Sequence, residues 1–187
     1  MPRTRFPSRP EGKSQEAGEY KTTMSTIRVQ KPVIHTPTFQ KWGIQQYYFL
    51  QKVQALGIDV FPKTDDFTLD DWYYYTDLDG WAKILPDLVL NSNLYKPNVF
   101  DCEDYGLKAQ IECSLRYGIN SLRLCIGKVP KGWHGFNIFP YGDDKGIEGL
   151  MLFEPNAGFE WAGNAFQIGD NGYIPEAVFL SSRKERR

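Results

Sequence analysis

The chain has 187 residues, a length that suits one domain with a single substantial core. Its apolar fraction of 41% and aromatic fraction of 15% argue against wholesale disorder. The formal net charge is -1, but residues 1–23 carry +2 and residues 183–187 carry +3, which leaves -6 on the body between them. An acidic body without a basic patch argues against nucleic-acid binding.

The cysteines and the apolar pattern exclude further classes. Cys102, Cys113 and Cys125 form no C-x-x-C motif, so neither a disulfide framework nor a zinc site is expected. The N-terminus lacks the apolar region of a secretory signal, and no stretch approaches the roughly 20 apolar residues of a membrane span. We therefore expect no membrane partner and, by default, a cytoplasmic protein. The oligomeric state is left open.

In the first third of the chain, polar composition, apolar periodicity and glycine positions indicate where structure begins and ends. Residues 1–23 are polar and aperiodic, and we expect a disordered leader there; residues 183–187 are expected to form a basic tail, and residues 24–182 a single domain. A short extended segment is expected over 27–33. A helix is expected over 39–56, because its apolar residues recur mostly at intervals of three or four before Gly57 ends it.

Residues 58–100 are rich in aromatic side chains and irregular in pattern. The acidic run before Trp72 favours a turn leading into a helix, and residues 81–90 favour one or two short turns around Pro86. The aromatic side chains either pack the core of this part of the domain or wall a substrate cleft. They are Trp72, Tyr73, Tyr74, Tyr75, Trp81 and Tyr95.

The pattern sharpens from Asp101 onward. Asp101 is a good N-cap with Asp104 three residues later, and Gly118 is a good stop, so a helix is predicted over 102–117. Two rows run along this helix, an apolar one (Leu107, Ile111 and Leu115) and one of small residues (Gly106, Ala109 and Cys113). Strands are predicted over 121–127, 133–139, 149–154, 165–168 and 177–180. This order predicts an α+β domain, a helix followed by an antiparallel sheet.

Cys102 is a candidate nucleophile because it opens the predicted helix. A helix N-terminus favours the thiolate, and its free N–H groups can stabilise an oxyanion on an attacked carbonyl. The alternative is that Cys102 is a small buried apolar residue, which is the reading we adopt for Cys113 and Cys125.

His134 and Glu154 are candidate partners of Cys102. His134 begins one predicted strand, and Glu154 closes the next. If the two strands pair as a hairpin, the start of the first lies near the end of the second, where a carboxylate can orient an imidazole. The alternatives are a structural histidine and an ordinary surface glutamate.

Three segments also resemble a known superfamily. Phe100–Gly106, Trp133–Phe139 and Phe153–Asn156 resemble motifs of papain-like and transglutaminase-like cysteine peptidases, above all the branch that holds the protease domain of the Marasmius oreades agglutinin. The resemblance covers about residues 81–180; Gly106 replaces the usual Ala, and Asn156 replaces Gln. It implies N-terminal helices, with a catalytic cysteine at a helix N-terminus packed on an antiparallel sheet.

The resemblance also implies roles for single residues. It makes Cys102 the nucleophile, His134 the general base and Glu154 the orienting acid. The agglutinin branch is calcium-dependent, which makes Asp101, Glu103 and Asp104 candidate ligands, although helix capping explains these acids equally well. Papain-like enzymes place a glutamine shortly before the cysteine, and this chain has none between 55 and 101. Asn91, Asn93 or Asn98 could take its place as the oxyanion donor, and Asn98 is the nearest of them to Cys102 in sequence.

The function expected from these residues is hydrolysis. The chain is predicted to be a cysteine peptidase that cleaves peptide or isopeptide bonds through a thioacyl intermediate, with a protein or peptide as its substrate. Two alternatives stay open. One is transglutaminase-type acyl transfer by the same residues, and the other is a non-catalytic structural module, associated with a phage or a toxin.

Overall fold

A computed structural model describes residues 37–61, 67–68, 70–180 and 182–183. The predicted leader over 1–23, the extended segment over 27–33 and residues 184–187 of the predicted tail lie outside these ranges. The predicted domain boundaries therefore stay predictions. Within the described residues, no helix has the length and apolar character that a membrane span requires.

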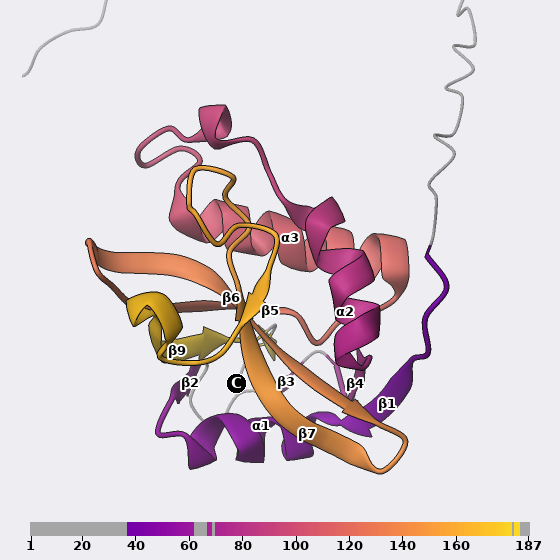
Figure 1. Cartoon of the computed structure of the whole chain (residues 1–187). Helices are drawn as coiled ribbons and strands as arrows, with labels where there is room; N and C mark the ends of the chain where they lie inside the picture. Colours follow the sequence, from indigo (N-terminus) through magenta and orange to yellow (C-terminus); the bar gives the residue numbers. More distant parts are fainter. Residues whose placement is uncertain (1–36, 62–66, 69, 181, 184–187) are drawn as a thin grey trace, which may run out of the picture. The chain divides into compact units, whose positions relative to one another are not determined.

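A six-stranded sheet carries most of the regular structure (Figure 1). Its strand order is β2-β9-β5-β6-β7-β8, and every neighbouring pair is antiparallel except β2 with β9. The strands in this order are β2 (Asp59–Phe61), β9 (Ile174–Phe179), β5 (Arg123–Val129), β6 (Gly132–Asp143), β7 (Gly146–Phe153) and β8 (Ala165–Phe166).

Strands β6 and β7 form a hairpin in the sheet. It turns at Asp143, whose side chain accepts a hydrogen bond from the Lys145 amide at 2.8 Å, and at Gly146, whose φ of 130° is open to glycine. In the register of the pair, Asn137 lies opposite Phe153. The predicted antiparallel pairing of 133–139 with 149–154 is thus confirmed, although both strands extend further toward the turn.

Helix α3 (Cys102–Tyr117) has the predicted bounds. Asp101 and Asp104 form a capping box at its start, and Gly118 ends it with a left-handed φ of 64°. The helix packs on β5 and β6 through its small residues, whereas the predicted apolar row is the more exposed one. Leu107, Ile111 and Leu115 are 39, 58 and 76% exposed.

The remaining helices are fewer and shorter than predicted. The helix expected over 39–56 is a strand, β1 (Trp42–Gln45), followed by α1 (Gln46–Ala55), and the turn-to-helix step before Trp72 leads into β4 (Trp72–Tyr75). β1 pairs with β4, so tertiary pairing of aromatic and β-branched residues overrides the helical period. The turns around Pro86 are present as α2 (Leu78–Ile84) and a 3₁₀ turn, η1 (Leu85–Leu88).

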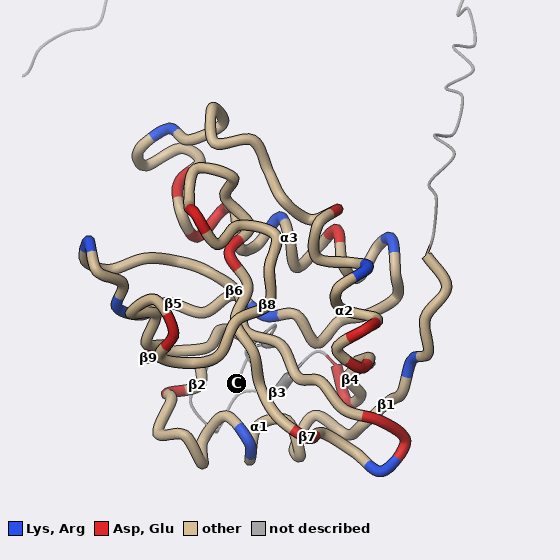
Figure 2. Tube along the Cα trace, viewed as in Figure 1, with Lys and Arg blue, Asp and Glu red and all other residues tan. Residues whose placement is uncertain are grey.

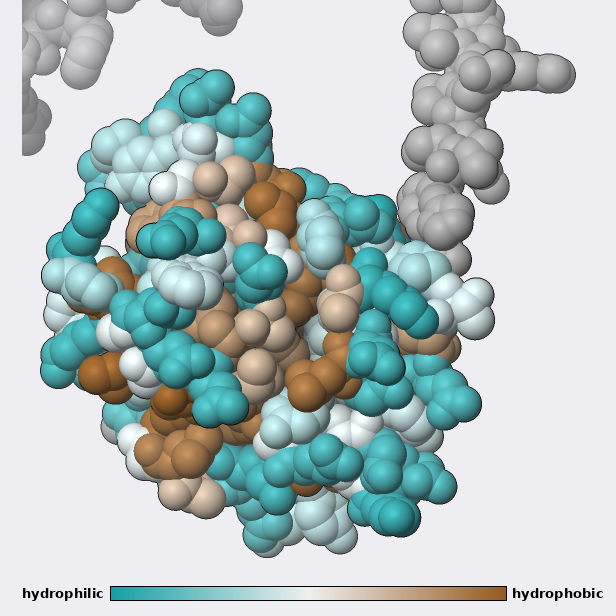
Figure 3. Space-filling view, in the orientation of Figure 1, coloured by the Kyte–Doolittle hydropathy of each residue, from teal (hydrophilic) through white to brown (hydrophobic). Residues whose placement is uncertain are grey.

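Short elements complete the described part of the chain. β3 (Phe67–Thr68) pairs with β10 (Ser182–Arg183), and two further 3₁₀ turns are η2 (Ser92–Leu94) and η3 (Asp170–Gly172). Acidic and basic residues are interspersed over the described trace (Figure 2). Apolar residues reach the surface in several patches of the face that Figure 3 shows.

Both faces of the central sheet are buried. One face packs against α1 and β4 through side chains such as Phe49, Tyr73 and Phe136. The other packs against α2, η1 and α3 through Trp81 and Phe139, whose rings lie 4.4 Å apart. Burial of the apolar side chains on both faces supplies the main stabilising free energy of the fold.

The predicted fold class is therefore wrong in its balance. The sequence predicted a papain-like α+β domain in which N-terminal helices pack on a sheet, but strands hold more of the described residues than α-helices do. The cause is local. Four residues of the first predicted helix form β1, and the predicted turn-to-helix step leads into β4, because these two segments pair with each other.

Candidate functional site

Cys102 is the first residue of α3 and is partly exposed. It comes close to β6 because residue 135 is glycine: a Cβ there would lie 2.9 Å from the Glu103 amide nitrogen and 3.0 Å from the Cys102 carbonyl carbon. No real side chain tolerates such distances to backbone atoms. Gly135 thus lets the start of α3 approach the strand position next to His134.

His134 joins the two other predicted site residues. Its Nε2 lies 2.7 Å from Oε2 of Glu154, and its ring is also hydrogen-bonded to the Cys102 side chain. The structure therefore brings Cys102, His134 and Glu154 together in the predicted order.

The surroundings of His134 favour its charged form. Burial of the ring acts to lower its pKa, but the hydrogen bonds to Cys102 and Glu154 and the charge of Glu154 outweigh burial and raise the pKa to about 9. At neutral pH the imidazole is therefore an imidazolium beside a sulfur atom.

Glu154 is fully buried yet well satisfied. Its Oε1 accepts the Asn156 amide at 2.9 Å, and its Oε2 accepts His134 and the Tyr173 hydroxyl, the latter at 3.2 Å. Three donors compensate for the loss of water around the carboxylate. Burial first, and then the charge of Glu154, raise the pKa of Tyr173, so this hydroxyl remains a donor.

Aromatic rings enclose the histidine. Phe159 stacks on the His134 ring at 4.4 Å with an interplanar angle of 26°, and Phe136 and Tyr173 lie at 6.2 and 6.3 Å. Neither Phe159 nor Tyr173 was predicted from the sequence. Phe159 lies in the loop that follows Glu154, and this closeness in sequence is the one signal that could have pointed to it.

Three of the six aromatic residues singled out before α3 pack the core, which is the first of their two predicted roles. Tyr73, Tyr75 and Trp81 are nearly or fully buried and belong to the core. Trp72, Tyr74 and Tyr95 are exposed to 50, 44 and 49%. Packing, and not a cleft wall beside Cys102, therefore accounts for the buried members of this run.

The predicted calcium ligands are only partly assembled. Donor atoms of Asp101, Cys102 and Glu103 lie within 4.8 Å of one another, whereas the Asp104 carboxylate accepts the Asp101 amide at 3.1 Å as part of the helix cap. Two carboxylates and a thiol supply fewer oxygens than the six to eight that calcium takes. The set fits calcium in part, and the rest of the coordination would have to come from water or substrate.

The acids at the helix start also interact with one another. The pKa of Asp101 is lowered, first by its contact with Glu103 and then by the Asn98 amide. The Cys102 thiol lies 3.4 Å from the Glu103 carboxylate. Asn98, the predicted oxyanion donor, has a left-handed φ of 59° and donates its backbone amide to Asp101 at 2.9 Å. Its role as an oxyanion donor stays a prediction.

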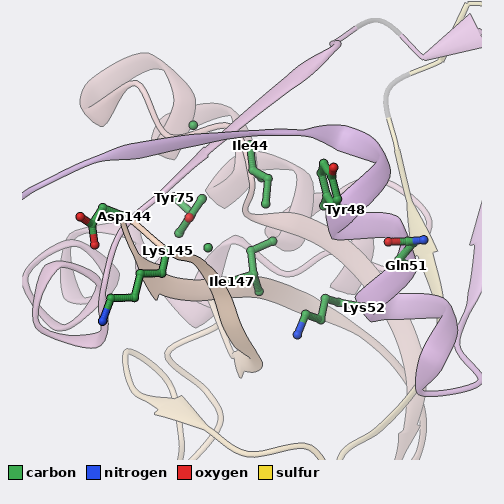
Figure 4. A pocket seen from close by; sticks show the side chains of 10 residues that line it. Ile44, Tyr48, Gln51, Lys52, Tyr75, Asp144, Lys145 and Ile147 are labelled. Atoms are coloured by element: carbon green, nitrogen blue, oxygen red, sulfur yellow. The ribbon is translucent and has the colours of Figure 1, made fainter.

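A separate cavity of about 490 Å³ lies between α1, β1 and the β6–β7 turn (Figure 4). Charged side chains from Lys52, Asp144 and Lys145 stand around it, together with Ile44, Tyr75 and Ile147. None of the predicted site residues belongs to its lining. The lining offers neither a thiol nor an imidazole.

Comparisons with known proteins give a fold. No family model and no curated protein matches the chain. Among solved structures, Polyporus squamosus lectin bound to a human-type influenza-binding epitope is similar at 15% identity and a TM-score of 0.51, over 74% of this chain and 49% of the lectin. A complex of PSL1a with E64 is similar at 17% identity and a TM-score of 0.48, over 74% of this chain and 51% of that one.

These comparisons correct the predicted family. The chain spans about half the length of the structures that it matches. The fold it shares is that of a region of Polyporus squamosus lectin. The predicted membership in the papain-like and transglutaminase-like superfamily, with the agglutinin branch of Marasmius oreades, is overturned by this finding. The protease and transglutaminase assignments that followed from that membership have no support from it.

Proposed function

We propose that this chain is a thiol-dependent hydrolase that opens a peptide or isopeptide bond at Cys102. The observation that supports the proposal is the hydrogen-bonded chain from Cys102 through His134 to Glu154, in which the acid is fully buried. A buried carboxylate that orients an imidazole next to a thiol is costly unless it is satisfied, and here three donors satisfy it.

The proposed reaction has two halves. The thiolate of Cys102 attacks the carbonyl carbon, and the carbon–nitrogen bond breaks as His134 gives its proton to the leaving amine. His134 then takes a proton from water, the hydroxide opens the thioester, and the thiol and a carboxylate are released. In this proposal, backbone amides in the first turn of α3 receive the oxyanion, because the helix dipole favours negative charge there.

Selective alkylation tests the nucleophile. Iodoacetamide should label Cys102 in the folded chain at pH 7.5 while sparing the buried Cys113 and Cys125, as read by peptide mapping in a mass spectrometer. Replacing the base, His134→Gln, should slow this labelling about tenfold or more. Equal labelling of the three cysteines, or none at native conditions, would overturn the proposal.

Turnover is tested with the same variants. A mixture of peptides of known sequence should acquire new N-termini during incubation with the wild-type chain and none with Cys102→Ala. If an amine added to the mixture becomes joined to the new C-terminal carboxyl groups, the enzyme transfers acyl groups instead of hydrolysing them. Unchanged cleavage by Cys102→Ala would contradict the assignment.

Calcium dependence is tested separately. Asp101 and Glu103 would hold the ion, so a chelator should reduce cleavage and added calcium should restore it, whereas Glu103→Gln should respond less to both. Tryptophan fluorescence during a calcium titration gives a readout that does not depend on activity. Equal activity and fluorescence with chelator and with calcium would remove the metal from the proposal.

A further inference from the structure

A second cavity adjoins the site on the side of its aromatic rings. It encloses about 460 Å³, within the range of small-ligand pockets. Its walls come from the β5–β6 turn, from the loop that follows Glu154, and from the segment at η3. They are Val129, Pro130, Lys131, Gly158, Phe159, Glu160, Trp161, Asn171 and Tyr173.

Two wall residues are also neighbours of the proposed catalytic pair. Phe159 has one contact with the cavity and another with the ring of His134, on which it stacks. Tyr173 lines the cavity and donates to Glu154. The cavity therefore shares two of its lining residues with the surroundings of the His134–Glu154 pair.

The cavity walls are held by defined contacts. In the loop after Glu154, the Gly158 amide bonds to the Asn156 side chain at 2.9 Å, and the Gly163 amide returns to the Glu154 carbonyl at 3.2 Å. The loop lies beside the segment before α3, where Leu90 pairs with Asn156 (Figure 1). At the opposite wall, a Cβ on Gly172 would be 2.9 Å from the Pro130 ring.

The chemistry of the walls is aromatic and has no net charge. Phe159, Trp161 and Tyr173 present rings, and Trp161 keeps 39% of its surface exposed. The charged groups at the cavity are Lys131 and Glu160, which carry opposite signs. Such a surface favours an uncharged aromatic guest, because ring-to-ring contact adds to the burial of apolar area.

We infer that this cavity is the specificity pocket of the site and that it takes an aromatic side chain of the substrate, next to the bond that Cys102 opens. The inference rests on the proposed function, because it assigns the substrate class of the same site. Trp161 is the residue to change, since it lines the cavity and has no role in the hydrogen-bonded chain from Cys102 to Glu154.

The experiment compares the wild-type chain with Trp161→Ala and with a control, Trp72→Ala. Trp72 is another exposed tryptophan, 50% accessible, on β4 in a separate two-stranded sheet. Each protein digests a mixture of peptides of known sequence, and a mass spectrometer identifies the cleaved bonds. Wild type and control should show Phe, Tyr or Trp enriched at least fivefold at one position within two residues of the cleaved bond, and Trp161→Ala less than twofold.

Alkylation by iodoacetamide tests the nucleophile Cys102 separately from the specificity pocket, because iodoacetamide has no side chain that the pocket could bind. Cys102 should be alkylated at the same rate in all three proteins. Normal alkylation with cleavage that shows no aromatic preference, a preference for charged residues, or a preference unchanged in Trp161→Ala would overturn the pocket and leave the hydrolase standing. Absence of selective alkylation would overturn both.

Discussion

A single carboxylate oxygen organises the site at the scale of residues. Oε2 of Glu154 receives both the His134 ring and the Tyr173 hydroxyl. A histidine can swing about two side-chain torsions, so its orientation toward the thiol depends on an acid that is itself fixed. Tyr173 holds that acid from a buried position, and we regard it as a positioning residue.

Tyr173→Phe should keep the ring packing and lose the hydroxyl donor. We expect the free energy of unfolding to fall by about 1–3 kcal/mol, as when a hydrogen bond to a charged group is removed, and Cys102 alkylation to slow severalfold. Tyr75→Phe is the matched control, because the buried Tyr75 donates from β4 to the Asp143 carbonyl at 2.8 Å, at the turn end of β6. Urea unfolding and alkylation rates decide the matter; equal alkylation in both variants would make Tyr173 merely structural.

The predicted trio could be located from sequence, but its support could not. Cys102, His134 and Glu154 each stand at the end of an element, and ends of elements are marked by caps, turns and apolar runs. Tyr173 and Phe159 carry no such mark, because what distinguishes them is the partner that each meets in the fold. Their ring and hydroxyl contacts depend on the path of two loops, which no local pattern fixes.

Contact between two elements decides the geometry at the next scale. The start of α3 rests against β6 at Gly135, where a methyl group would meet backbone atoms that belong to Cys102 and Glu103. The same helix meets β5 through Gly106, where a methyl group would meet the end of the Leu124 side chain at 2.6 Å. A side-chain end can rotate away, whereas a helix start must shift as a body.

Gly135→Ala should therefore displace the thiol. We expect Cys102 alkylation and peptide cleavage to fall at least tenfold, because misplacement of reacting groups by about 1 Å costs on the order of 100-fold. Gly106→Ala should stay within about twofold of the wild type. Rates for both variants, with circular dichroism to show that each is folded, check this; similar losses in the two would refute the argument.

The elements themselves were predicted unevenly. Helix α3 was placed to the residue, since Asp101, Asp104 and Gly118 are strong local signals. Its buried face was less evident, because small residues and not the leucines meet the sheet. The segment over 39–56 was predicted as helix throughout, and only its pairing with residues 72–75 makes the first part a strand. That pairing is long-range and leaves no local trace.

The protonation of the buried His134–Glu154 pair affects the free energy of unfolding of the whole molecule. The pKa of His134 rises from 6.5 to about 9 on folding, so the folded state holds a proton that the unfolded state releases earlier. The stabilisation is complete below about pH 6.5 and is lost as the pH rises toward 9. Because the pKa of His134 is raised on folding, high pH and not mildly acidic pH weakens the His134–Glu154 pair.

We expect the free energy of unfolding to fall between pH 6.5 and 9.5 by at most about 3 kcal/mol more in the wild type than in His134→Gln. Urea unfolding at a series of pH values measures this difference, and the subtraction removes the contribution of groups that both chains share. Parallel pH profiles would show that the imidazolium contributes nothing to stability.

At the scale of the whole molecule, the sequence located the sheet better than the layers upon it. The apolar runs along β5, β6 and β7 are a strong signal because both faces of these strands are buried. The parallel pairing of β2 with β9 joins residues about 118 apart in the sequence, Asp59 with Ala177. Neither that pairing nor the proportion of helix and strand follows from composition. The predicted fold class was wrong because it was taken from the predicted family.

The burial of two of the three thiols has a consequence for oxidation. Cys113 and Cys125 lie in the two cores, where burial raises the pKa of each, while Cys102 reaches the solvent. Peroxide attacks accessible thiolates, so damage concentrates on Cys102. A sulfenic acid formed there has no neighbouring cysteine to resolve it as an internal disulfide, and only an external thiol returns it to the reduced state. Storage without reductant would then remove the reactive Cys102 thiol while the fold stays intact.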